Sequence, residues 1–140
     1  MNEKDKLSTG IHLIDHQYFF FSDSLNKFSD AMKNGEGKEE VIKILRFLDI
    51  HTQKYFTREE DFMRENSYLD IDLHIAQHDE FKKQYGKLRN DFMTKGYSIV
   101  VGLSVQRLMS EWLNQHVLKT DSILGDYICT VCADIAKLEN

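Results

Sequence analysis

Residues 74–81 read His74-Ile-Ala-Gln-His78-Asp-Glu-Phe81, and this stretch decides the fold. Two imidazoles four residues apart lie one turn apart on the same side of a helix, so both rings can face a single metal ion. The stretch belongs to a longer row with the three–four spacing of a buried helix face. The row consists of Ile71, His74, His78, Phe81, Tyr85, Leu88 and Phe92. Because both histidines take core positions, their ring nitrogens need buried partners from elsewhere in the chain.

The composition predicts a single helical domain. The chain has 140 residues, no proline and only 7 glycines, which is typical of a helical bundle with its own core. A net charge of −5 argues against nucleic acid and anionic membranes as partners. No apolar run is long enough to span a membrane, and the polar start lacks the apolar core of a secretion signal. With only two cysteines, we expect a reduced, cytoplasmic protein.

Four apolar rows with a period near 3.6 predict an all-α fold, an up-down-up-down antiparallel four-helix bundle. One domain is expected over residues 1–140, beginning with an irregular N-terminal arm over 1–13 and a helix N-cap at Asp15. The helices are expected near residues 15–34, 38–65, 71–93 and 99–124, with loops near 35–37, 66–71 and 94–98. Residues 125–140 form a tail that can extend the last helix past Gly125.

The second predicted helix carries a carboxylate in its inner row. That row consists of Ile44, Leu48, His51, Tyr55, Glu59 and Phe62. A core face does not normally accept a carboxylate unless a cation or a hydrogen-bond donor pairs with it. Glu59 therefore indicates a metal ion or another cation in the interior.

The fourth predicted helix contributes His116 to the interior, and Asp121 follows five residues later. Five residues correspond to roughly 140° around a regular helix, so ideal geometry would not aim both side chains at one target. Two arrangements stay open. Either the side chains converge from a wide angle, or the helix contains a π-bulge between them.

Together these positions predict a metal site in the bundle interior. Its candidate ligands are His74, His78, His116, Glu59 and Asp121, from three helices. Three imidazoles with one or two carboxylates suit non-haem iron and would also hold zinc or manganese. Carboxylates that can bridge favour iron, as one ion or a pair. The alternative is a bundle whose buried polar residues satisfy one another.

The spacing resembles a known family, the hemerythrin-like proteins of the bacterial single-domain kind. The resemblance runs from Thr9 to about Asp121 and rests on four motifs. These are Gly10-Ile-His-Leu-Ile-Asp15-His-Gln17, Phe56-Thr-Arg-Glu59-Glu60-Asp-Phe-Met63, His74-xxx-His78-xx-Phe81 and Trp112-Leu-xx-His116-xxxx-Asp121. The resemblance implies a four-helix bundle with two non-haem irons, joined by an oxo or hydroxo bridge. It further implies that the three histidines ligate one iron and that Glu59 and Asp121 bridge the pair.

The chain departs from the family pattern at the second iron, which binds O2 in the family. The family places a histidine on each of the first two helices there, whereas this chain has Tyr18 and Tyr55. His16 lies roughly 200° from Tyr18 around the helix and should point away from the site. His51 lies one turn before Tyr55 and is either an inward ligand or a core imidazole bonded to a neighbour.

Two tyrosines allow two kinds of site. A phenol has a pKa near 10, but a bound ferric ion can remove its proton, and two phenolates would favour Fe(III) over Fe(II). Alternatively, both phenols stay neutral, bond to the carboxylates and fill the volume of the second ion, which leaves a mononuclear site. We therefore include Tyr18 and Tyr55 among the candidate metal ligands.

Cys129 and Cys132 form a Cys-x-x-Cys in the tail, outside the family pattern. No strand precedes them, so the context is not thioredoxin-like, and two thiols cannot complete a zinc site within one chain. Packing at helical spacing is the favoured interpretation. A redox switch and an intersubunit metal site are the alternatives.

Three functions compete at this stage. The first is a binding protein whose iron holds O2, NO or a related oxidant such as peroxide, for carriage, scavenging or sensing. The second is an iron enzyme of the oxidase or peroxidase type, although no general base or nucleophile stands out beyond the ligands. The third is a storage or structural role for the metal. We favour binding over catalysis, and the oligomeric state is open.

Overall fold

The computed structural model describes residues 12–139 and the side chains of residues 17–130. Its elements in chain order are α2 (His12–Lys33), α3 (Gly37–Glu65), α4 (Ile71–Lys95), α5 (Ile99–Trp112), the π-helical segment η1 (Leu113–Thr120) and α6 (Asp121–Glu139). Most of the arm expected over residues 1–13 lies outside the described residues. Its last two residues begin α2, so Asp15 lies within the helix and is not its N-cap.

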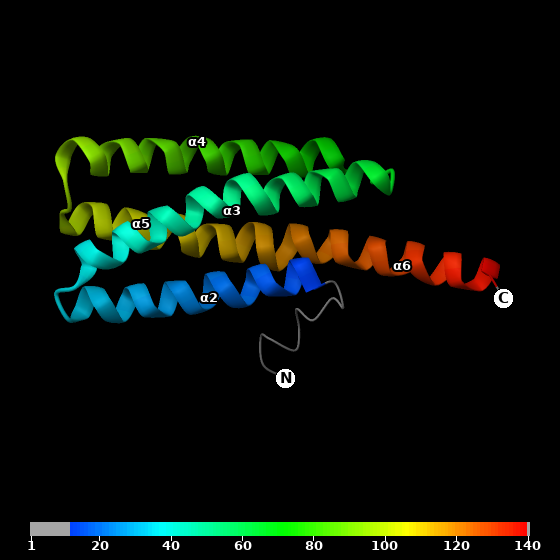
Figure 1. Cartoon of the computed structure of the whole chain (residues 1–140), viewed down its shortest axis with the longest axis horizontal. Helices are drawn as coiled ribbons and strands as arrows, with labels where there is room; N and C mark the ends of the chain where they lie inside the picture. The colour runs from blue at the N-terminus through cyan, green and yellow to red at the C-terminus, as the bar shows by residue number, and fades with distance from the viewer. Residues whose placement is uncertain (1–11, 140) are drawn as a thin grey trace.

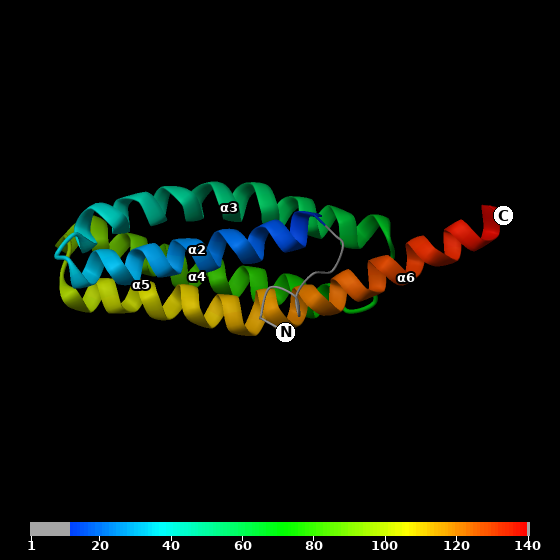
Figure 2. The same ribbon diagram turned by 90° about the horizontal axis from the view of Figure 1, so that it is seen from below.

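The helices form the predicted antiparallel four-helix bundle. In Figures 1 and 2, α2, α3, α4 and α5 run along one axis, and each reverses the direction of the one before. Consecutive helices pack on one another, and α5 with η1 closes the arrangement against α2. Residues 12–139 contain no β-strand. The all-α prediction is confirmed. None of the described helices has the length and apolar character that a membrane span needs.

The three connections between the helices are short and fall within or beside the expected loops, at residues 34–36, 66–70 and 96–98. Gly35 and Gly96 adopt φ angles of 75° and 77°, a left-handed conformation that glycine reaches without steric cost. Ser98 caps α5, since its hydroxyl oxygen accepts a hydrogen bond from the Val101 backbone N–H at 3.2 Å. These connections hold the four helices in register along most of their length.

The core follows the predicted apolar rows, with one systematic difference on α3. Tyr55 and Phe62, both expected in the inner row, are only half-buried, whereas Thr52, Phe56 and Met63 are buried beside Glu59. Steps of four residues place Tyr55 about 40° from both His51 and Glu59 around the helix, so its position in the row does not account for its exposure. Its exposure depends on how the neighbouring helices cover α3.

The last long helix runs through α5, η1 and α6 and extends beyond the other three helices (Figure 2). Gly125 does not interrupt it. A second apolar cluster of Met63, Tyr68, Leu124 and Ile128 packs the start of α6 against the end of α3. This packing fixes the position of Asp121, the first residue of α6.

Candidate metal centre

A π-helical segment brings His116 and Asp121 to the same side of the last long helix. The backbone N–H of Asp121 donates to the carbonyl oxygen of His116, five residues earlier. This hydrogen bond closes a wider turn than the α-helical one, so residues five apart face the same way. Nε2 of His116 accordingly lies 3.1 Å from Oδ1 of Asp121. Of the two arrangements that the sequence left open, the structure adopts the π-helical one.

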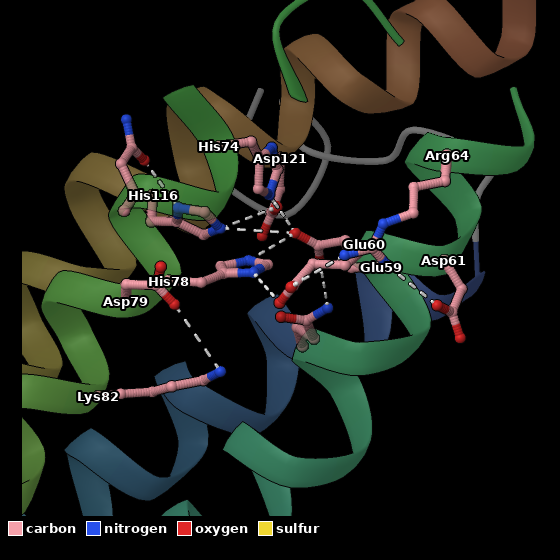
Figure 3. A network of polar contacts seen from close by, with 12 residues as sticks. Glu59, Glu60, Asp61, Arg64, His74, His78, Asp79, Lys82, His116 and Asp121 are labelled. Carbon is pink, nitrogen blue, oxygen red and sulfur yellow. Dashed lines mark hydrogen bonds and ion pairs between the residues drawn. The ribbon is translucent and has the colours of Figure 1, made fainter. Parts of the chain in front are cut away.

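Three imidazole nitrogens converge on one carboxylate oxygen, Oε1 of Glu59. His74 and His78 lie one turn apart on α4 and face Glu59 on α3 (Figure 3). Nε2 of His74 contacts this oxygen, Nε2 of His78 lies 3.1 Å from it, and Nε2 of His116 lies 3.5 Å from it. All four residues are buried, and their ligand atoms lie within 4.8 Å of one another. Three nitrogen donors and a carboxylate at this spacing fit a transition-metal ion.

The outer nitrogens of two rings have acceptor partners that fix which nitrogen faces inward. Nδ1 of His78 donates to Oε2 of Glu60 at 3.0 Å. Nδ1 of His116 donates to Oε1 of Gln77 at 2.8 Å, and Thr120 donates to the same oxygen at 2.9 Å. A neutral imidazole that donates through Nδ1 keeps its lone pair on Nε2, the form a metal ligand requires. The neighbours of both rings thus leave Nε2 free to act as a metal ligand.

Asp121 supplies a second buried carboxylate. Its Oδ1 lies 3.2 Å from Nε2 of His74 and 3.1 Å from Nε2 of His116. Its Oδ2 is buried without a hydrogen-bond partner among the described residues. A buried carboxylate with an open oxygen is unfavourable by itself and fits a position beside a cation.

Aromatic rings enclose the polar cluster. Phe56 stacks on His78 with a ring-centroid distance of 4.0 Å, and Trp112 stacks on His116 with a distance of 3.9 Å. These apolar walls keep water away from the carboxylates and strengthen every electrostatic interaction between them and a cation. They also hold each imidazole in one plane.

The buried charges shift one another's pKa values. Burial alone would raise the pKa of the Glu59 carboxyl, but contacts with the His116, His74 and His78 rings hold that pKa well below its usual value. Burial would lower the pKa of His74, whereas Asp121 and Glu59 raise it to about 9. Burial raises the pKa of Asp121, and the charge on Glu59 raises it further. Two carboxylates therefore compete for the same positive partners, a conflict that a metal cation would relieve.

The remaining candidates, Tyr18, Tyr55 and His51, lie on α2 and α3. Tyr18 is buried on α2, and Tyr55 on α3 stacks on His51 with a ring-centroid distance of 4.9 Å. His51 also packs edge-on against Phe21 and lies outside the cluster of four donors that includes Glu59. His16 lies in α2, but its side chain is outside the described part of the chain. The role of Tyr18 and Tyr55 as ligands stays a prediction.

Three residues of the site had no role assigned from the sequence: Gln17, Glu60 and Gln77. Gln17 is 1% exposed, and its Nε2 donates to Oε2 of Glu59 at 2.8 Å. A signal for it existed, because Gln17 lies three residues after Ile14 and four before Phe21, on the inner row of its helix. Gln77 lies three residues after His74 and so faces the same neighbouring helix. Glu60 reaches His78 from the edge of α3, where Arg64 lies 3.9 Å from its other oxygen.

A pocket of about 200 Å³ opens beside the cluster, between α4 and the helix formed by α5 and η1. Its apolar part is formed by Phe81, Leu108 and Trp112, and His116 also lines it. The pocket therefore reaches one of the three histidines that surround Glu59.

Comparison with known proteins identifies the family of the chain. The family described as the hemerythrin HHE cation binding domain matches residues 9–128. The chain belongs to the hemerythrin family. The resemblance drawn from the four sequence motifs is therefore confirmed at the level of the family.

Several hemerythrins are related to the chain along most of its length. A bacteriohemerythrin of Pseudomonas aeruginosa is 26% identical over 136 residues, which cover 96% of this chain and 85% of the relative. A bacteriohemerythrin of Aquifex aeolicus is 27% identical over 109 residues, covering 73% and 80%. A myohemerythrin of Theromyzon tessulatum is 25% identical over 108 residues, covering 77% of each. No solved structure matches the chain significantly.

Proposed function

We propose that this hemerythrin is a non-haem iron protein that binds or responds to O2, NO or a related oxidant. One observation carries the proposal: the Nε2 atoms of His74, His78 and His116 surround a single oxygen of Glu59 in a buried site. That donor set suits iron, and the names of the bacteriohemerythrin and myohemerythrin relatives point the same way. The proposal includes a cytoplasmic setting, where two cysteines in a reduced protein are ordinary.

We assign the three histidines to one iron and place Glu59 and Asp121 between it and a second. The open Oδ2 of Asp121 and the Gln17-bonded Oε2 of Glu59 leave each carboxylate with an oxygen beyond the histidines. Iron in such a site supplies one-electron redox chemistry and a coordination position for a small ligand. The chain contributes the orientation of the rings through Glu60 and Gln77, and the exclusion of water by Phe56 and Trp112.

Tyr18 and Tyr55 make ordinary reversible O2 carriage an unexpected role for this chain. In the first form of the proposal, both bind a second Fe(III) as phenolates. Phenolates are hard anionic donors, so they stabilise Fe(III) against reduction to Fe(II). In the second, neutral phenols fill the space beside a single metal ion. We favour the first form because Glu59 and Asp121 together supply more negative charge than one ion with three imidazoles requires.

The test is to load the purified chain with Fe(II) without oxygen, count iron per chain and record optical spectra before and after adding O2 or NO. We expect one or two tightly held irons and a spectrum that changes with at least one of the two gases. A chain that retains no iron, or whose iron spectrum responds to neither gas, contradicts the proposal. Loading the His51→Ala variant in parallel shows whether a buried imidazole outside the donor cluster is needed for iron binding.

A further inference from the structure

Gln17 has a buried side-chain carboxamide, and only its nitrogen has a hydrogen-bond partner among the described residues. It lies on α2, is 1% exposed, and donates through Nε2 to Oε2 of Glu59 at 2.8 Å. A carboxylate only accepts hydrogen bonds, so it fixes the amide with its nitrogen toward Glu59. The carboxamide oxygen, Oε1, is buried and has no hydrogen-bond partner among the described residues.

The site contains a second open oxygen. Oδ2 of Asp121 is likewise buried without a hydrogen-bond partner among the described residues, while Oδ1 of the same carboxylate lies 3.2 Å from Nε2 of His74 and 3.1 Å from Nε2 of His116. A buried polar atom without a partner is unfavourable, and most such atoms in folded proteins are paired. These oxygens can only accept hydrogen bonds, and a single cation between them would stabilise all of them.

We propose that Oε1 of Gln17 is a ligand of the second metal ion, on the far side of Glu59 from the three histidines. The inference rests on the proposed function and deepens it, since it names a ligand of the same centre. The donors of the cluster around Glu59 come from α3, α4, η1 and α6, and Gln17 adds a donor from α2, the helix that also carries Tyr18. A carboxamide oxygen is a hard, neutral donor and adds no further negative charge beside Glu59 and Asp121.

A weaker role for Gln17 is to hold Glu59 in place through the Nε2 hydrogen bond alone. Two substitutions separate the roles. Gln17→Glu keeps an oxygen at the end of a side chain of the same length, but it removes the N–H and brings a carboxylate against Glu59. Gln17→Met keeps the approximate volume and removes both the donor and the oxygen. If Gln17 only positions Glu59, the Glu variant is at least as damaging as the Met variant; if its oxygen binds metal, the Glu variant keeps the second ion.

The experiment titrates Fe(II) without oxygen into the wild-type chain, both variants and Gln53→Met, which changes an exposed glutamine on α3. Bound iron is counted per chain after removal of the excess. We expect two irons in the wild type, in Gln17→Glu and in Gln53→Met, and one in Gln17→Met. Circular dichroism establishes that each variant keeps the helical fold.

The outcomes distinguish this inference from the function it rests on. Two irons in Gln17→Met, or one in Gln17→Glu, overturn the role of Gln17 as a ligand. The proposed function as an iron protein is unaffected by either result. Should Gln17→Met fail to fold, the Gln17→Glu count decides alone, because two irons support ligation and one refutes it. A wild type that binds a single iron overturns the inference, and a wild type that binds none overturns the proposed function with it.

Discussion

Nδ1 of His116 lies 2.8 Å from Oε1 of Gln77, and this hydrogen bond directs the other ring nitrogen, Nε2, toward Glu59. The hydroxyl of Thr120 donates to the same oxygen from the end of η1. One carboxamide on α4 therefore holds both a histidine of the π-helical segment and the residue just before Asp121. The orientation of His116 depends on α4 as well as on its own helix.

Gln77→Ala is expected to weaken metal binding without emptying the site. The His116 ring loses its acceptor, can rotate or change tautomer, and becomes a poorer ligand. Loss of such an outer hydrogen bond lowers metal affinity by about 10–100-fold. The affinity is measured by competition with a chromophoric chelator, and Gln84→Ala removes an exposed carboxamide from the same helix as a control. Equal affinities in the two variants would show that Gln77 does not support the metal.

His78→Ala is expected to abolish tight binding at the histidine position and to destabilise the fold. The substitution removes one of three converging nitrogens. Glu59 and Glu60 both lose their contact with the His78 ring. Breaking a buried polar pair by removing one member costs about 3–5 kcal/mol. Metal content is measured by elemental analysis, and stability is measured by denaturant unfolding.

His51→Ala is the matched control for His78→Ala. His51 is a buried imidazole that packs against Phe21, Tyr55 and Phe56 outside the donor cluster. Its loss should lower stability by a comparable loss of packing while metal content stays at the wild-type level. A fall in metal content would instead make His51 a ligand, the alternative that its one-turn distance from Tyr55 suggested.

The sequence could predict the fold because each helix repeats one simple signal over many turns. Four apolar rows, interrupted where Gly35 and Gly96 permit a left-handed turn, leave little choice but a four-helix bundle. Finer placement depends on packing between helices, which periodicity does not contain. The half-burial of Tyr55 is such a case, because this residue lies between the buried His51 and Glu59 around the helix and is nevertheless not fully covered.

The site could be predicted only where a residue type is unusual in a core. Glu59 and the histidines stand out on apolar rows for that reason. Gln17 and Gln77 did not, because glutamine is ordinarily exposed. The burial of Gln17 and the half-burial of Gln77 become visible only with their partners in place. The π-helical turn before Asp121 also escaped a unique prediction, since it depends on how η1 is held by Gln77 and by the packing of α6.

Metal uptake is expected to release protons and to weaken below pH 9. In the metal-free protein, Asp121 and Glu59 raise the pKa of His74 from 6.5 to about 9, so this ring is protonated at pH 7. A metal ion binds only the deprotonated ring, and the apparent affinity falls by about tenfold per pH unit for each displaced proton. The sign follows from the raised pKa: the penalty is present below pH 9 and disappears above it. Proton release is followed with an indicator dye in weak buffer, and a pH-independent affinity between pH 6 and 9 would contradict the assignment.

The last prediction concerns Tyr18 and Tyr55, which we propose to stand where the hemerythrin family has the histidines of its O2-binding iron. Phenolate bound to Fe(III) absorbs visible light by charge transfer, so the oxidised protein should be coloured. Tyr18→Phe combined with Tyr55→Phe should bleach that colour, because phenylalanine fills the same space without an oxygen donor. Each single variant then shows which phenol contributes, and Tyr97→Phe removes a phenol elsewhere in the bundle as a control.

The converse substitution tests whether the two tyrosines are what sets this chain apart. Histidine at both positions supplies neutral nitrogen donors in place of anionic oxygens, which lowers the preference for Fe(III) and makes the reduced state accessible. Phe21, Trp112, Leu113 and Val117 are buried and apolar, and surroundings of this kind should accept a bound gas. The doubly substituted protein is therefore expected to bind O2 reversibly after reduction, measured by repeated optical cycles of oxygenation and removal of the gas. A wild-type chain that completes the same cycles would show that the phenols do not control the ligand chemistry.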